Sequence, residues 1–149
     1  MSDFTDFTHL HLHTEYSLLD GANRIKELAK TLKKQGVKAA AITDHGNMFG
    51  AIDFYKTMKN EGIKPLIGIE AYIHNGEELD DKSTKQRFHL CLIAKNEIGY
   101  KNLMYLSSMS YIEGFYYYPR INKKMLKEHS EGIICSSACL QGEVNWNLN

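Results

Sequence analysis

The chain has 149 residues, of which 43% are hydrophobic and 24% are charged, a composition that supports one globular domain with an apolar core. Its 18 basic and 18 acidic residues cancel, which excludes a protein that binds nucleic acid through a large basic excess. An acidic N-terminus and the lack of a long apolar run predict a cytoplasmic protein with no signal peptide and no membrane span.

Strands and helices are predicted in alternation along the first half of the chain. Residues 7–13 alternate in polarity and predict a strand, and 24–35 have the periodicity of an amphipathic helix. The pattern then repeats, with a short buried strand at 37–43, a helix at 49–60 and an apolar strand at 64–73. A glycine follows each helix, as expected at a helix C-terminus.

The second half follows a polar stretch and continues with a predicted strand at 87–94 and a helix at 96–113. Residues 115–121, FYYYPRI, are predicted to form a loop. Asn122 is placed to cap a short helix that ends at Glu128, and 132–137 form a last buried strand.

Alternating strands and helices favour right-handed crossovers and a mostly parallel sheet, either open or closed into a barrel. The pattern provides five strands, whereas a closed β/α barrel typically needs about 200 to 250 residues. We therefore expect residues 1–149 to form the N-terminal part of a single longer domain.

Three histidines in the first predicted strand are the first candidates for a metal site. His9, His11 and His13 are spaced two residues apart, so in a strand their side chains would share one face. Two imidazoles on that face suit one metal ion. The alternative is an exposed strand face with incidental histidines.

The second predicted strand ends in Asp44 and His45, at the edge where parallel α/β folds collect ligands and catalytic groups. Asp44 could instead cap the next helix, with His45 in solvent. Glu70 lies within an apolar strand, where a charge is costly unless it is paired or bound to metal. His89 is also embedded in an apolar strand, and an ordinary core histidine is its alternative interpretation.

The three cysteines contain no CxxC pair, which argues against a disulfide framework and a zinc ribbon. Cys139 follows the last strand and could reach a metal, because a thiolate is a good zinc ligand. Cys91 and Cys135 lie inside strands and are expected in the core, whereas His74 and His129 are expected at the surface.

These candidates outnumber the four ligands of one tetrahedral zinc ion, so two or more ions sharing a carboxylate such as Glu70 are expected. Clustered divalent ions suit phosphoester hydrolysis, because they lower the pKa of bound water and stabilise charge on phosphate oxygens.

The motifs His11-Leu12-His13, Thr43-Asp44-His45-Gly46, Glu70 and His89 resemble the PHP (polymerase and histidinol phosphatase) superfamily. The runs HLHLHTEYSLLDGA, ITDHGNMFGAIDFY, GIKPLIGIEAYI and EGFYYYPRIN are similar to the N-terminal PHP domains of bacterial DNA polymerase III alpha subunits. This resemblance implies an α/β fold, a distorted (β/α)7 TIM-like barrel of PHP type, which this chain would fill only in part.

The resemblance also implies a metal site with up to three divalent ions in a complete domain, zinc first and manganese or magnesium as alternatives. The implied ligands are His11, His13, Asp20, Asp44, His45, Glu70, His89 and Cys139, with His9 a weaker candidate because many relatives have Asp there. A late Asp-x-His motif of the family has no counterpart, so the metal site is expected to be incomplete.

The resemblance further implies a bacterial cytoplasmic replication protein. Nothing in the chain corresponds to a palm or fingers region, so DNA-directed DNA polymerase activity would belong to a longer parent protein. The implied partners are primer-template DNA, the remaining polymerase domains and a proofreading exonuclease subunit. Tyr116, Tyr117 and Arg120 are candidates for stacking on single-stranded DNA, although a loop packed against the barrel is the alternative.

Three functions remain open at this point. The first is a metal-dependent phosphoesterase, specifically a 3′-5′ exonuclease at primer ends. The second is a metal-stabilised structural module that braces the polymerase or docks a proofreading subunit. The third, a histidinol-phosphate-type phosphatase, is disfavoured by the polymerase-like segments.

Overall fold

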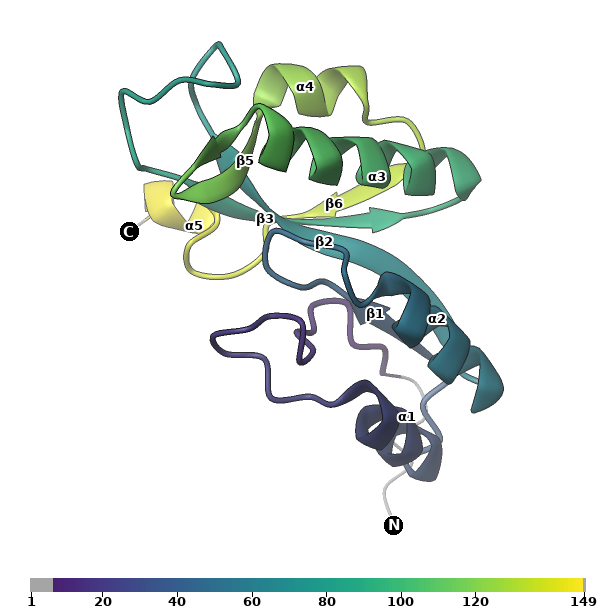
Figure 1. Cartoon of the computed structure of the whole chain (residues 1–149). Helices are drawn as coiled ribbons and strands as arrows, with labels where there is room; N and C mark the ends of the chain where they lie inside the picture. Colours follow the sequence, from purple (N-terminus) through teal and green to yellow (C-terminus); the bar gives the residue numbers. More distant parts are fainter. Residues whose placement is uncertain (1–6, 149) are drawn as a thin grey trace.

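A computed structural model describes residues 7–148 as strands and helices arranged around one long strand, β2 (Figure 1). In chain order the elements are α1 (Ile25–Lys34), β1 (Ala39–Ile42), α2 (Ala51–Asn60), β2 (Lys64–His74), β3 (Phe88–Ala94), α3 (Glu97–Ile112), β4 (Phe115–Tyr116), β5 (Tyr118–Asn122), α4 (Lys123–Glu128), β6 (Ile133–Ser136) and α5 (Glu143–Leu148). Every helix predicted from periodicity is present, with ends shifted by less than one turn.

Strand β2 has two successive sets of partners. Its first residues, Lys64 to Ile67, pair in parallel with β1, and the rest pairs antiparallel with β3 and parallel with β5. Gly68 lies at the changeover, where an added β-carbon would come within 2.5 Å of the Leu92 carbonyl oxygen. Any larger residue would therefore push β3 away from β2.

The sheet is mixed, and the prediction of a mostly parallel sheet is wrong. The β2–β3, β3–β6 and β4–β5 pairings are antiparallel, whereas β1–β2 and β2–β5 are parallel. The reason is that β2 and β3 are joined by a polar loop and not by a helix, and a loop connection allows neighbouring strands to run in opposite directions.

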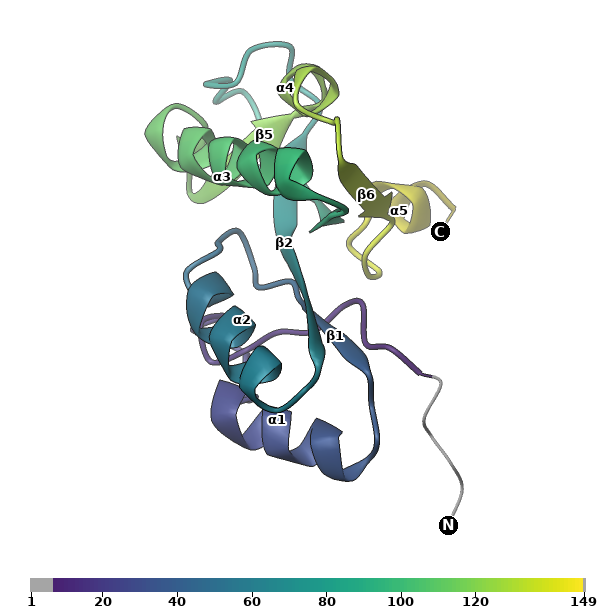
Figure 2. The same ribbon diagram turned by 90° about the vertical axis from the view of Figure 1, so that its right-hand side faces the viewer.

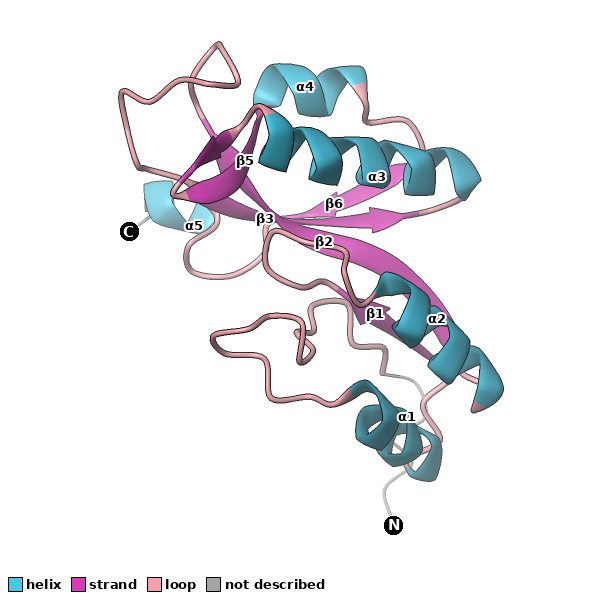
Figure 3. Cartoon of the chain, viewed as in Figure 1, coloured by secondary structure: helices cyan, strands magenta, loops and turns pink. Residues whose placement is uncertain are grey.

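Two hydrophobic cores lie at opposite ends of β2, so the chain has two regions that share this strand (Figures 2 and 3). In the N-terminal region α1 and α2 pack on β1 and the first part of β2, around Ile25, Ile42 and Phe54. In the C-terminal region α3 covers β2, β3 and β5, and its Leu103 and Leu106 are fully buried.

Residues 7–13 do not form the predicted strand. Only His9 makes an isolated bridge, to Ala40 in β1, although the segment continues alongside β1. The ladder is interrupted because the backbone N–H of Leu12 donates to the side-chain oxygen of Thr43 at 2.8 Å. A side chain thus replaces the backbone acceptor that a regular strand would use.

The predicted loop at 115–121 is instead a small hairpin of β4 and β5, and β5 joins the sheet beside β2. Pro119, which has no N–H to donate, is the second residue of β5 and pairs with Phe115 of β4. Within residues 7–148, no helix is long and apolar enough to cross a membrane.

Candidate metal centre

The centre is built on the face of β2 opposite the second core. Ile69, Ala71 and Ile73 point into that core, so the alternation of a strand directs Glu70 and Tyr72 to the other face. Tyr72 pairs with His89 of β3, which brings His89 to the same face as Glu70. Strand register therefore positions two of the predicted ligands.

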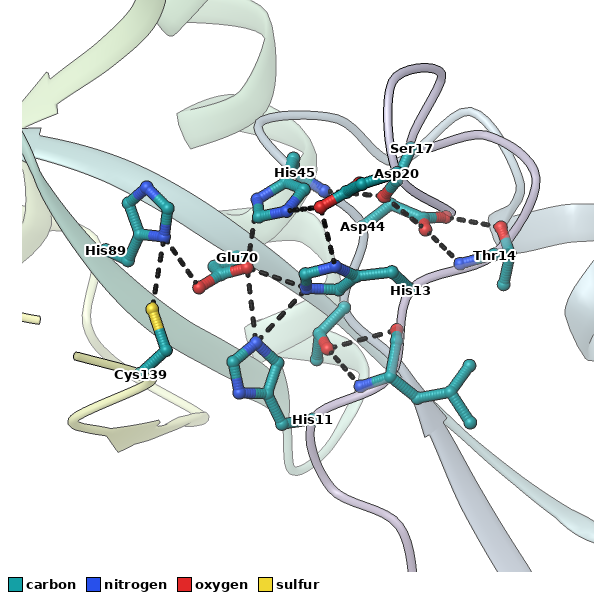
Figure 4. A network of polar contacts seen from close by, with 12 residues as sticks. His11, His13, Thr14, Ser17, Asp20, Asp44, His45, Glu70, His89 and Cys139 are labelled. Atoms are coloured by element: carbon teal, nitrogen blue, oxygen red, sulfur yellow. Dashed lines mark hydrogen bonds and ion pairs between the residues drawn. The ribbon is translucent and has the colours of Figure 1, made fainter. Parts of the chain in front are cut away.

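The Glu70 carboxylate is fully buried and surrounded by four imidazoles (Figure 4). Its Oε2 lies 3.2 Å from His11 Nε2, 2.7 Å from His13 Nε2 and 3.0 Å from His45 Nδ1. Its Oε1 lies 3.0 Å from His89 Nδ1. One carboxylate from β2 thus meets histidines from both regions of the chain.

Asp20 completes the cluster from the loop that follows the histidine segment. Its Oδ2 lies 3.0 Å from His45 Nε2 and 3.9 Å from His13 Nδ1, and its side chain is 56% exposed. Asp20 is therefore the member of the cluster that is most open to solvent.

Three overlapping groups have ligand atoms close enough to hold a metal ion, and His13, His45 and Glu70 each belong to two of them. The groups are His11–His13–Glu70, His13–Asp20–His45 and His45–Glu70–His89. Shared ligands are what a cluster of neighbouring divalent ions requires.

Asp44, which was also predicted as a metal ligand, lies outside these groups. Its Oδ1 accepts hydrogen bonds from Thr14 N at 2.6 Å and from Ser17 Oγ at 2.8 Å, and its Oδ2 accepts one from Thr14 Oγ1 at 2.7 Å. Because Asp44 is fully buried, these hydrogen-bond donors stabilise the negative charge of its carboxylate. It is a positioning residue that ties the histidine segment to the end of β1.

His45 is held by its backbone and by an aromatic ring. Its N–H donates to Ser17 Oγ at 3.1 Å, and its imidazole is parallel to the Tyr72 ring, with 6.2 Å between centroids. Gly46 follows with φ of +62°, and a β-carbon there would lie 2.8 Å from the Tyr72 ring. Glycine thus allows the tyrosine to approach the site.

Cys139 approaches the site from the loop between β6 and α5. Its Sγ lies 3.4 Å from His89 Nδ1 and also accepts from Gln141 N at 3.4 Å. It is not in any of the three ligand groups. The structure places this thiol at the rim of the centre, beside the His89 imidazole.

The remaining predicted residues lie away from the centre. His9 contacts the Phe7 ring and is in none of the three groups. Arg120 is fully buried, and its guanidinium donates to the carbonyl oxygens of Gly114, Thr84 and Asp81. It cannot contact DNA, which corrects that prediction, whereas Tyr117 is exposed.

His74, expected at the surface, is also buried, in the part of β2 that pairs with β5. Burial, together with the nearby charge of Arg120, lowers its pKa, so this imidazole is neutral. His129 stacks on Tyr105 with 4.0 Å between ring centroids and takes no part in the centre.

The electrostatics of the cluster favour an ionised carboxylate. Burial alone would raise the pKa of Glu70, but the surrounding imidazoles hold it far below its usual range. Hydrogen bonds with Cys91 and then with Glu70 raise the pKa of His11 to about 10. The pKa of His45 is raised mainly by the adjacent Glu70 carboxylate.

The donor set fits divalent metal ions. Glu70 Oε2 and His45 Nδ1 are buried and 3.0 Å apart, yet neither has a partner in hydrogen-bond geometry among the described residues. Two ligands of one tetrahedral zinc ion are separated by about 3.3 Å, close to the spacings around Glu70. These two buried ligand atoms thus face a shared centre without forming a hydrogen bond with one another.

The sequence patterns missed four residues that support the site: Thr14, Ser17, Tyr72 and Cys91. Thr14 and Ser17 donate hydrogen bonds to Asp44. The only sequence signal for this role is the polar segment that directly follows the histidines. Tyr72 lies two residues after Glu70 in the same predicted strand, so it could have been assigned to the same face. Cys91 is buried as expected, but its contact with His11 depends on tertiary structure.

Residues 9–148 match the model of the PHP domain, and the chain therefore belongs to the PHP domain family. Within that family it is 78% identical to DNA polymerase III subunit alpha of Campylobacter jejuni over 145 residues, which cover 97% of this chain and 12% of that protein. It is 73% identical over 149 residues to DNA polymerase III subunit alpha of Helicobacter pylori strain 26695, covering 100% of this chain and 12% of the relative.

The chain thus corresponds to a PHP domain of the type found in DNA polymerase III alpha subunits and spans about an eighth of their length. Among solved structures it is similar to an amidohydrolase from Chromobacterium violaceum, with a TM-score of 0.47 and 19% identity over 68% of this chain and 34% of that one. A putative metal-dependent phosphoesterase from Bifidobacterium adolescentis gives 0.46 and 19%, over 70% and 34% of the two chains.

Proposed function

We propose that this domain is a metal-dependent phosphoesterase within a DNA polymerase III alpha subunit and acts as a 3′-5′ exonuclease on primer ends. The buried Glu70 carboxylate carries this proposal, because it gathers four imidazoles and links ligand groups that suit neighbouring ions. The parent protein would be a cytoplasmic bacterial polymerase whose partners are primer-template DNA, its other domains and a proofreading subunit.

His11, His13, Asp20, His45, Glu70 and His89 would hold the ions, with Cys139 beside His89. Zinc is the first candidate because imidazole nitrogen predominates in the donor set, and manganese or magnesium are the alternatives. Bound divalent ions would supply an activated water and offset charge on the phosphate oxygens.

The protein's own contribution is orientation. Asp44 fixes the loop between the histidine segment and Asp20, and β-sheet register fixes Glu70 and His89. Asp20 is the exposed member, so an entering phosphodiester would meet the cluster on that side. Preorganised groups of this kind need not rearrange when charge develops during hydrolysis.

The test is nucleotide release from a 3′-labelled primer by the full-length polypeptide that carries this domain, purified without any separate exonuclease subunit. We expect release with zinc or manganese and a loss of about 100-fold or more in Glu70→Gln, because ligand removal costs at least as much as loss of a supporting residue. Lys34→Ala, an exposed change in α1, is the control. No release from protein with demonstrated bound metal would overturn the proposal.

The second candidate is a structural role, favoured by ligands that come from both regions and meet at β2. In that case metal binding is folding free energy. Glu70→Gln should then lower the melting temperature and the yield of active polymerase, with no nuclease activity to lose. A histidinol-phosphate-type phosphatase has no comparable support, since the relatives of 73% and 78% identity are polymerase subunits.

A further inference from the structure

Tyr72 connects the candidate metal centre to a second cluster of side chains on the same face of the sheet. Its ring contacts His45 and His89 on one side and the Tyr118 ring on the other, with 5.1 Å between the tyrosine centroids. The loop that leads into β3 lies beside β4 and β5 (Figure 1), which brings Lys85 and Arg87 to these tyrosines. Only the width of one ring separates this cluster from the imidazoles.

Two cations lie over aromatic rings in this cluster. The Arg87 guanidinium carbon is 3.5 Å from the Tyr118 centroid and 5.2 Å from the Tyr72 centroid, and Lys85 Nζ is 3.9 Å from the Tyr117 centroid. In the described part of the chain neither cation forms an ion pair, and Arg87 Nε is buried without a hydrogen-bond partner. A guanidinium that is oriented by two aromatic rings and has no carboxylate partner among residues 7–148 suits an incoming anion.

Tyr117 is the one residue at the turn of the hairpin, between the paired residues Tyr116 and Tyr118. Its φ of 61° is left-handed, which costs a residue other than glycine of order 1–3 kcal/mol, and such strain concentrates at functional sites. The strained backbone nevertheless leaves the side chain 60% exposed. The hairpin thus presents a ring to solvent beside two cations.

We propose that Lys85, Arg87, Tyr117 and Tyr118 form a cation–tyrosine subsite for single-stranded DNA, in which Arg87 holds a backbone phosphate and Tyr117 stacks on a base. Stacking on aromatic rings beside a local positive charge is the usual chemistry of single-strand recognition. A local subsite also suits a chain with no net charge. This proposal rests on the proposed function, because the subsite would direct a 3′ end to the metal centre.

The test uses the full-length polypeptide in EDTA, with an oligothymidylate that carries 5-iodouracil at its 3′ end. Photocrosslinks are mapped by mass spectrometry, which separates this subsite from DNA bound elsewhere in a polymerase. We expect crosslinks at Tyr117 or Tyr118. Arg87→Ala should reduce their yield about tenfold and lower the salt dependence of crosslinking by about 0.7 in log–log slope, the value for one phosphate on a single strand.

Tyr117→Gly is the second variant, because glycine accepts the left-handed backbone and removes only the ring. It should abolish stacking on the base, which lowers the crosslinking yield about tenfold, and leave the salt dependence of crosslinking unchanged. Arg87→Lys should keep the salt dependence of crosslinking. Lys34→Ala should change neither the crosslinking yield nor its salt dependence. Circular dichroism of each variant must match the parent, so that a folding defect is recognised.

Crosslinks confined to other domains, or an Arg87→Ala variant that behaves like Lys34→Ala, would overturn the subsite. The outcomes also separate the two proposals. If no nucleotide is released with metal but crosslinking still depends on Arg87, the subsite stands and the nuclease proposal fails. If nucleotide release persists with an unchanged KM in Arg87→Ala, the nuclease proposal stands and the subsite fails.

Discussion

The two regions that share β2 hold their metal-site residues by different means. In the N-terminal region His11, His13 and Asp20 lie on irregular segments that are tied to the buried carboxylate of Asp44 through Thr14 and Ser17. In the C-terminal region strand register alone places Glu70 opposite Cys91, and His89 opposite Tyr72. Loop ligands therefore depend on a polar network, whereas strand ligands depend on the sheet.

The largest effect that tests this comparison is expected for Asp44→Ala. It would leave three buried donors unsatisfied, at about 1–3 kcal/mol each, so we expect a loss of at least about 3 kcal/mol in the free energy of unfolding. Urea denaturation of the variant and of Asp80→Ala, an exposed acidic control, measures the difference. A loss below 1 kcal/mol would mean that the network does not organise the N-terminal region.

The next largest effect is expected on metal affinity when the polar network of the N-terminal region is changed. Ser17→Ala removes a hydrogen bond to Asp44 and the acceptor for His45 N–H, so affinity should fall about tenfold although Ser17 touches no ligand atom of the centre. Competition with a chromophoric chelator measures this change. Ser130→Ala, whose hydroxyl caps a carbonyl far along the chain, is the matched control and should keep the parent affinity.

A smaller effect is expected where local sequence alone determines structure. Asn122 begins α4 and accepts a hydrogen bond from Met125 N at 2.9 Å, so Asn122→Ala should cost about 1 kcal/mol. Its amide also donates to the Glu77 carbonyl at 2.7 Å, so Asn96→Ala, which removes the N-cap of α3, is a useful parallel variant. Thermal melts should show the larger shift for Asn122→Ala, which also loses the bond to Glu77, and unchanged metal affinity in both variants would confirm that caps act locally.

The smallest expected effect is a change in pH dependence. In metal-free protein the pKa of His11 is raised from 6.5 to about 10, so its contribution to stability is complete below pH 6.5 and is lost as the pH rises towards 10. Bound metal needs neutral imidazoles, so the loaded protein should behave in the opposite way and release metal in acid. Melting curves from pH 6 to 10, with EDTA or with zinc, should diverge by a few degrees. Parallel curves would contradict this expectation.

The sequence predicted the features that depend on periodicity. Helices α1 to α4 and strands β1, β2, β3 and β6 follow from apolar spacing and from caps such as Asn122. The prediction that β6 is buried is wrong, because most of its residues, Cys135 included, are exposed. The same logic identified Glu70 and His89, because a charge or an imidazole inside an apolar strand stands out in the sequence. The family assignment based on the motifs is confirmed for residues 9–148.

Features that depend on contacts between distant segments could not be predicted in this way. The segment at 7–13 alternates like a strand, but the Thr43 side chain takes the hydrogen bond of Leu12 N and interrupts its pairing. The hydrogen bonds of Asp44 with Thr14 and Ser17 join segments that are distant in the sequence, so only the folded structure shows them. Arg120 belonged to a tyrosine-rich run, and nothing in that run indicates that it is buried.

The shared strand has a further consequence for how the domain would respond to its surroundings. Since β2 belongs to both regions and Glu70 lies just beyond the changeover at Gly68, any shear between the regions alters the spacing of the imidazoles around that carboxylate. If the ions favour one spacing of these ligands, metal occupancy and the relative position of the two regions would be linked, and such linkage is reciprocal. A partner that bound either region would then change the affinity for metal, and bound metal would change the affinity for that partner.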